Sequence, residues 1–150
     1  MESVAKTIRC EIAHRLVNGY PGKCAHCHGH GLVVQITLTM RHQVNLDQFG
    51  FVTDYANFGP LKQWIDECWD HAILLHEDDP LVRVLQSSAF DVNGKPHRVH
   101  TFDGNPTSEN IARRLLWKAR QLLENDRVYV SQVKVFETCT SECTLTVSEL

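Results

Sequence analysis

Residues 32–40 read LVVQITLTM, and an apolar side chain occupies every second position of this stretch. The positions between them include Gln35, Thr37 and Thr39, which are polar. Alternation with a period of two is typical of a strand that buries one face of a sheet. Residues 7–16 alternate in the same way. We therefore expect two strands here, connected by the Cys- and His-rich segment that lies between them.

Two later segments change to a helical period. Residues 60–69 place apolar side chains at i, i+3, i+4 and i+7, which indicates an amphipathic helix. A second helix is predicted over residues 107–124, with Thr107 as its N-cap and Glu109 in its first turn. Residues 128–136 are rich in β-branched side chains and predict a last strand.

Residues 81–90 and 97–102 are predicted to form a hairpin around Asn93-Gly94, a dipeptide that favours tight turns. The expected order is then strand, strand, helix, hairpin, helix, strand. This order is typical of an α+β fold in which two helices pack on one face of an antiparallel β-sheet. The other face of the sheet must be solvated or covered by another subunit.

The bulk composition narrows the function. The 150 residues suit a single domain spanning 1–150. A net charge of −3 argues against a nucleic-acid partner, and the apolar runs are too short to span a membrane. Because the N-terminus shows no secretory signal, we expect a cytoplasmic protein whose six cysteines bind metal or take part in catalysis.

The segment 24–30 reads CAHCHGH and carries the chemistry. His28 and His30 are two residues apart, so on an extended backbone their imidazoles point to the same side and can reach one metal ion. Zinc readily accepts imidazole nitrogen, and a catalytic zinc typically has three protein ligands and one open position. His14, near the end of the preceding strand, is the natural third ligand.

Other residues are suited to proton transfer or ligand binding. Cys24 lies four residues before His28, and a thiol near a metal or another cation can act as a base. In Asp70-His71, the carboxylate can fix the tautomer of the imidazole. Glu137 follows the last strand and can accept two parallel N–H donors, such as those of a 2-aminopyrimidinone ring.

An ordered set of motifs resembles the 6-pyruvoyltetrahydropterin and 6-carboxytetrahydropterin synthases. The motifs are AHRL (13–16), CAHCHGH (24–30), DY (54–55), LK (61–62), DH (70–71), PTSEN (106–110) and ETCT (137–140). The resemblance implies the tunnelling fold, in which the sheets and helices of several subunits assemble into an oligomeric barrel. It also implies homo-oligomers, hexamers in many members, with active sites between subunits.

The resemblance assigns a role to each chemical group. It implies that His14, His28 and His30 bind Zn2+ and that Cys24 is the general base.

By the same resemblance, Asp70 and His71 complete a proton relay. Glu137 anchors the pterin ring of the substrate, and Thr107 and Ser108 help to hold it.

The implied substrate is a pterin triphosphate, 7,8-dihydroneopterin triphosphate. Three residues separate Cys24 from the His-Gly-His motif, as in the 6-carboxytetrahydropterin synthases of the queuosine (7-deazaguanine) pathway. This spacing favours 6-carboxy-5,6,7,8-tetrahydropterin as the product, with release of triphosphate and acetaldehyde. The alternative is a 6-pyruvoyltetrahydropterin synthase, which releases triphosphate only.

Two other hypotheses come from the cysteines. A closed four-thiolate zinc site formed by Cys24, Cys27, Cys139 and Cys143 would make the protein a non-catalytic structural module. This hypothesis leaves the histidines without a role. Residues 24–28 also match the attachment pattern for c-type haem, but haem attachment usually needs an exported protein.

Overall fold

A computed structural model describes residues 1–149 and contains one sheet of six strands. The strands are β1 (Ser3–His14), β2 (His28–Met40), β3 (Ala72–His76), β4 (Val99–Phe102), β5 (Val128–Thr138) and β6 (Ser141–Thr146). They lie in the order β4-β3-β1-β2-β5-β6. The α-helices are α1 (Gly59–Cys68), α2 (Pro80–Leu85) and α3 (Ser108–Leu123), and short 3-10 turns cover Lys23–Ala25, Tyr55–Phe58 and Ser88–Phe90.

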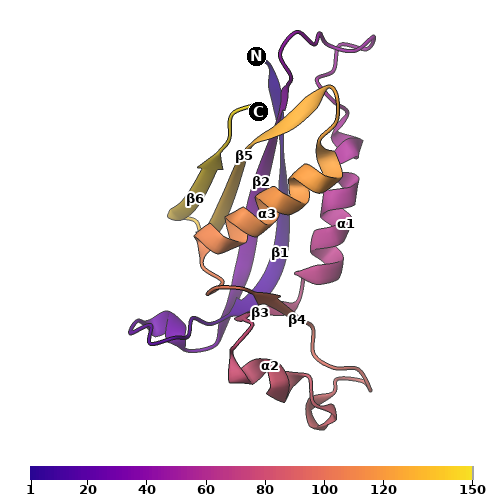
Figure 1. Cartoon of the computed structure of the whole chain (residues 1–150). Helices are drawn as coiled ribbons and strands as arrows, with labels where there is room; N and C mark the ends of the chain where they lie inside the picture. Colours follow the sequence, from indigo (N-terminus) through magenta and orange to yellow (C-terminus); the bar gives the residue numbers. More distant parts are fainter. Residues whose placement is uncertain (150) are drawn as a thin grey trace.

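The two strands predicted from the alternating stretches form the centre of the sheet. β1 and β2 are antiparallel along their whole length, from the pair Ser3–Thr39 to the pair His14–His28. Figure 1 shows that the loop joining them lies at the opposite end of the molecule from both chain termini. This register brings the end of β1 next to the start of β2.

Helices α1 and α3 cover one face of the sheet, as predicted (Figure 1). Leu61 and Ile65 of α1 are fully buried, and so are Ile111 and Leu115 of α3. Full burial of such a side chain stabilises the fold by about 1.5–3 kcal/mol. The core therefore lies between these two helices and the buried face of the sheet.

The sheet is mixed and not wholly antiparallel, which corrects the predicted pairing while the α+β class is confirmed. β1 pairs with β2 in antiparallel fashion, but β3 runs parallel to β1 and also to β4. Longer segments separate the members of these pairs along the chain, because β2 and α1 lie between β1 and β3, and α2 with the loop after it lies between β3 and β4.

The predicted strand over residues 81–90 is wrong, because its first half forms α2. The Asp79 side chain caps this helix by accepting a hydrogen bond from the Leu81 backbone N–H (2.8 Å), and Pro80 occupies the first turn. An N-cap aspartate followed by proline favours a helix start. In a short segment, this signal outweighs the strand preference of its valines.

The Asn93-Gly94 turn is present, with positive φ at both residues, but it closes a small loop instead of a strand hairpin. The predicted strand 97–102 is confirmed as β4. The short strands β3 and β6 were not predicted.

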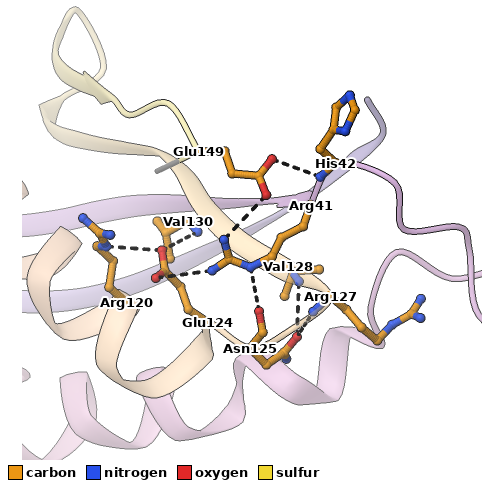
Figure 2. Close-up of polar contacts among 9 residues, drawn as sticks. All are labelled: Arg41, His42, Arg120, Glu124, Asn125, Arg127, Val128, Val130 and Glu149. Carbon is orange, nitrogen blue, oxygen red and sulfur yellow. Dashed lines mark hydrogen bonds and ion pairs between the residues drawn. The ribbon is translucent and has the colours of Figure 1, made fainter.

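A polar network fixes the far end of the β1–β2 pair, where β2 ends (Figure 2). Arg41 lies at its centre and donates from Nε to the Asn125 carbonyl (2.8 Å). Its guanidinium also lies 4.0 Å from Glu124 and 3.7 Å from Glu149. These contacts join the end of β2 to the residues after α3 and to the C-terminal segment.

Within the described residues, no helix has the length and apolar character needed to cross a membrane.

Candidate metal centre

Three imidazoles converge where β1 ends and β2 begins. The Nε2 atom of His14 lies 3.1 Å from that of His28 and 3.2 Å from that of His30. The strand register places His14 directly opposite His28, and strand alternation turns His30 to the same side. Within residues 1–149 these three form the only group of histidine, cysteine or carboxylate side chains close enough to share a metal ion.

Backbone carbonyls orient all three rings. Each Nδ1 lies near a carbonyl oxygen: that of Pro106 for His14 (2.9 Å), of His26 for His28 (2.8 Å) and of Gly31 for His30 (2.9 Å). A carbonyl oxygen only accepts hydrogen bonds, so Nδ1 carries the proton in each ring. Each Nε2 therefore presents a lone pair to the other two.

This arrangement fits a divalent metal ion. Three lone pairs at such short separations repel one another unless a cation lies between them. Metal–nitrogen bonds of about 2.0–2.1 Å place neighbouring ligands of a tetrahedral site about 3.3 Å apart, close to the 3.1 and 3.2 Å seen here. The three histidines can thus hold a metal and leave one coordination position open.

The environment of His14 favours the neutral imidazole, which is the form that binds metal. Its side chain is 3% exposed, and burial lowers its pKa. The Pro106 carbonyl and the nearby Glu137 carboxylate raise the pKa, while the neighbouring histidines lower it further. The net pKa is below the usual value for histidine, so His14 is ready to act as a ligand near neutral pH.

The predicted Asp70–His71 pair is present at the turn between α1 and β3. Asp70 accepts a hydrogen bond from the Glu11 backbone N–H (2.9 Å) and another from His71 Nδ1 (2.8 Å). These two bonds, the first more than the second, lower the pKa of the Asp70 carboxyl. The His71 side chain is 73% exposed, so the pair is oriented but open to solvent.

Cys24 lies in the 3-10 turn between β1 and β2, and its carbonyl accepts a hydrogen bond from the Leu16 N–H (2.8 Å). Its thiol is half-buried. Among the described residues, no hydrogen bond joins this thiol to Asp70 or His71. A single copy of the chain therefore does not connect the predicted base to the predicted relay.

The hypothesis of a four-thiolate zinc site finds no support in this structure. All six cysteines are free, and Cys27 and Cys139 are exposed. No three of the cysteines in residues 1–149 are close enough together to bind one metal ion. The only such group consists of the histidines, which that hypothesis left without a role.

Glu137 is placed by an irregularity in β5. The pairing of β5 with β6 shifts between Phe136 and Thr138, which leaves Glu137 as the extra residue of a bulge. Its side chain is half-buried and lines a cavity of about 430 Å³ on the sheet face that the helices leave open. Arg9 and Val33 also line this cavity.

Thr107 is the N-cap of α3, as predicted, and Ser108 is the first residue of this helix. Both follow Pro106, so the start of α3 lies beside the buried His14. The contribution of Pro106 was not predicted, because the chemistry resides in its main-chain carbonyl and leaves no signal in residue type.

Solved structures share this fold, a six-stranded mixed sheet covered by two helices. An uncharacterized protein from Wolinella succinogenes superimposes with a TM-score of 0.79 at 28% identity, with 98% of each chain covered. The 6-pyruvoyl tetrahydropterin synthase of Caenorhabditis elegans superimposes with a TM-score of 0.67 at 21% identity, covering 98% of this chain and 96% of that one. The fold is thus the one found in tetrahydropterin synthases.

The chain belongs to the 6-pyruvoyl tetrahydropterin synthase family, whose profile matches residues 3–148. Within the family, it is similar to the 6-carboxy-5,6,7,8-tetrahydropterin synthase of Rickettsia bellii, with 32% identity over 92% of this chain and 95% of the relative. The enzyme of the same name from Haemophilus influenzae is 25% identical over 95% of this chain and 97% of its own length.

Proposed function

We propose that this protein is a zinc-dependent 6-carboxy-5,6,7,8-tetrahydropterin synthase. It would convert 7,8-dihydroneopterin triphosphate to the 6-carboxy product and release triphosphate and acetaldehyde. The observation that carries the proposal is the convergence of three Nε2 atoms, with His14 3.1 and 3.2 Å from the other two. Full-length similarity to relatives with this name supports the choice of reaction.

His14, His28 and His30 would hold the zinc ion in this proposal. When bound, zinc would supply Lewis-acid polarisation of the substrate side chain. The protein fixes the tautomer of all three ligands through backbone carbonyls. Such outer contacts orient metal ligands and raise their basicity.

Glu137 would bind the pterin ring. Its carboxylate can accept the two parallel N–H donors of the 2-aminopyrimidinone edge, a strong charge-assisted pairing. The adjoining cavity of about 430 Å³ falls within the usual range for small-molecule sites. Thr107 and Ser108, at the start of α3, would contact the pterin from the side nearest His14.

Cys24, Asp70 and His71 would move the protons. Cys24 would be the general base, while Asp70 holds His71 by its Nδ1–H and leaves the other ring nitrogen free to exchange a proton. Because one copy does not join Cys24 to His71, we propose that a neighbouring copy completes each active site. The protein would then act as a homo-oligomer.

The cellular setting follows from the same proposal. The spacing of Cys24 and His28 supports a role in queuosine or another 7-deazaguanine pathway. The net charge of −3 argues against a nucleic-acid partner. We propose one domain, residues 1–150, that works in the cytoplasm.

A product assay tests the proposal. Purified protein reconstituted with zinc is incubated with 7,8-dihydroneopterin triphosphate, with and without a chelator, and the products are identified by mass spectrometry. The expected result is 6-carboxytetrahydropterin that forms only without the chelator. A 6-pyruvoyl product would support the alternative synthase and contradict the argument from spacing. Absence of turnover in folded, zinc-loaded protein would contradict both.

A further inference from the structure

The carbonyl that orients His14 belongs to a loop whose own position needs an explanation. His14 Nδ1 donates to the Pro106 carbonyl oxygen over 2.9 Å, in a site where the His14 side chain is 3% exposed. His14 is the most buried of the three histidines. Proline has no backbone N–H, so Pro106 cannot donate a backbone hydrogen bond that would anchor it. Neighbouring residues must hold its carbonyl in place.

Asn105 is bonded to the chain that leaves β1. Its side-chain Oδ1 accepts from the Val17 backbone N–H (2.8 Å), and its Nδ2 donates to the Val17 carbonyl (3.1 Å). Val17 lies three residues after His14, so one amide side chain satisfies both backbone groups of a residue close to the ligand. This two-point contact fixes both the distance and the orientation of the loop relative to His14.

The main chain of Asn105 is also bonded to α3. Its carbonyl accepts from Asn110 Nδ2 (2.8 Å) and from the Thr107 backbone N–H (2.8 Å). Asn105 therefore connects the segment after β1 to the first turn of α3. Pro106, the next residue, is held between these two attachments.

We propose that Asn105 is a positioning residue for the metal centre. Its side chain sets the place of the Pro106 carbonyl, and that carbonyl keeps the proton of His14 on Nδ1 and the lone pair of Nε2 toward the metal. This inference rests on the proposed metal binding by His14. It differs from a purely structural role because it predicts a change at the metal itself when the Asn105 side chain is lost.

The test compares Asn105→Ala with Asn125→Ala. Asn125 Oδ1 accepts from the backbone N–H groups of Arg127 (2.8 Å) and Val128 (3.2 Å), in the network at the far end of the sheet (Figure 2). Each variant thus loses two hydrogen bonds between a side chain and the backbone, but only Asn105→Ala loses them near the candidate metal centre. Three quantities are measured: the zinc dissociation constant by chelator competition, the visible spectrum of the cobalt(II) form, and metal-free stability.

We expect Asn105→Ala to raise the zinc dissociation constant about 10-fold, the lower end of the usual effect of losing a group that is hydrogen-bonded to a metal ligand. The cobalt(II) spectrum should also change, because the position of one imidazole is no longer fixed. Asn125→Ala should lower the stability of the metal-free protein and leave the dissociation constant and the spectrum unchanged.

If Asn105→Ala does not fold, Asn105→Asp replaces it. This variant keeps the size and the acceptor for Val17 N–H, but it loses the donor and turns a carboxylate oxygen toward the Val17 carbonyl. Its zinc dissociation constant should also rise, because these two oxygens repel each other. If the wild-type protein binds zinc tightly and a folded Asn105 variant has the same zinc dissociation constant and the same cobalt(II) spectrum, this inference alone is overturned. A wild-type protein that binds no zinc would overturn the proposed function and this inference with it.

Discussion

His71 occupies a backbone conformation that most residues avoid. Its φ is +58°, at the turn where α1 ends and β3 begins, in the left-handed region that glycine usually occupies. For a residue with a side chain this conformation costs about 1–2 kcal/mol. Such strain is often found at functional sites. The conformation here accompanies the hydrogen bond from His71 Nδ1 to Asp70, which agrees with the proposed proton relay.

Another single residue, Asp79, ties α2 to the end of β1. Its carboxylate caps α2 and also accepts two hydrogen bonds from Arg15, one of them from Nε over 2.7 Å. The Asp79 side chain is fully buried. The Arg15 guanidinium is the main cause that lowers the pKa of the Asp79 carboxyl. Because Arg15 follows His14 directly, this pair holds the strand end that carries the first histidine of the candidate metal centre.

The lowered pKa of Asp79 makes stability depend on pH. An unfolded aspartate has a pKa of about 3.9, so the stabilisation is complete above that pH and is lost as the pH falls through the lower folded pKa. Replacing Asp79 by Asn should reduce the free energy of unfolding near neutral pH by about 1–3 kcal/mol. As the pH falls below about 5, this variant should also lose less of its unfolding free energy than the wild-type protein does.

Urea unfolding of the metal-free protein at several pH values measures this effect. Asp78→Asn is the matched control, because the neighbouring Asp78 side chain is 84% exposed. This control should follow the wild-type curve. An Asp79→Asn variant with the wild-type pH dependence would show that the buried pair with Arg15 contributes nothing to it.

At the scale of elements, the important feature is the β-bulge near the end of β5. The extra residue at this bulge is Glu137, flanked by Phe136 and Thr138 in the shifted pairing with β6. A bulge bends its strand and re-aims side chains. Here the carboxylate lines the open-face cavity and also acts on the pKa of His14. The bulge thus connects the proposed pterin pocket to the metal centre.

Glu137→Gln should weaken substrate binding without loss of metal. The variant keeps the shape of the side chain and loses the charge that strengthens the pairing with the pterin edge. A charge-assisted hydrogen bond contributes about 1.5–3 kcal/mol, which corresponds to a rise in KM of about 10–100-fold. Steady-state kinetics measure KM, and metal analysis verifies the zinc content.

Glu142→Gln serves as the control, because Glu142 pairs with Phe136 across the same two strands and its carboxylate contacts Lys134 instead (3.3 Å). Its KM should equal the wild-type value. An unchanged KM in Glu137→Gln would contradict the proposal that Glu137 binds the pterin ring.

At the scale of the whole molecule, the sheet has one covered face and one open face (Figure 1). Among the described residues, the edge strands of the sheet are β4 and β6, and each of them pairs with a strand on one side only. Unpaired edges are surfaces on which another chain can pair. These features agree with our proposal that several copies assemble and that Cys24 of one copy works with His71 of another.

Mixing two inactive variants tests this sharing of active sites. Cys24→Ala removes the base, and His71→Asn removes the relay while asparagine tolerates the left-handed conformation. Each variant alone should be inactive. Hybrid oligomers made by co-expression should recover about a quarter of the wild-type rate with random mixing, because some sites combine both intact residues.

A mixture of Cys24→Ala with His28→Ala is the control and should stay inactive, since both residues are proposed to serve the active site from the same copy. Native mass spectrometry verifies that hybrids form. Hybrids of the first pair without activity would show that the relay is not shared between copies.

The sequence by itself determined the long regular elements and the three histidines that could hold a metal. β1, β2, α1 and α3 were predictable because their periodicity continues over many residues and is encoded locally. The two-residue spacing of His28 and His30 is also local, and it predicted that their side chains point to the same side of the strand. The order of the motifs indicated the family that the comparisons confirm. The roles assigned to Cys24, Glu137 and the other proposed active-site groups stay predictions.

The tertiary structure alone decided the features that depend on distant contacts. The parallel pairing of β3, the bulge at Glu137 and the Pro106 carbonyl near His14 have no long local pattern. In short segments, local preferences are weak and packing decides between them. A main-chain group becomes part of a site only when folding brings it there, and for that reason residue type could not reveal it.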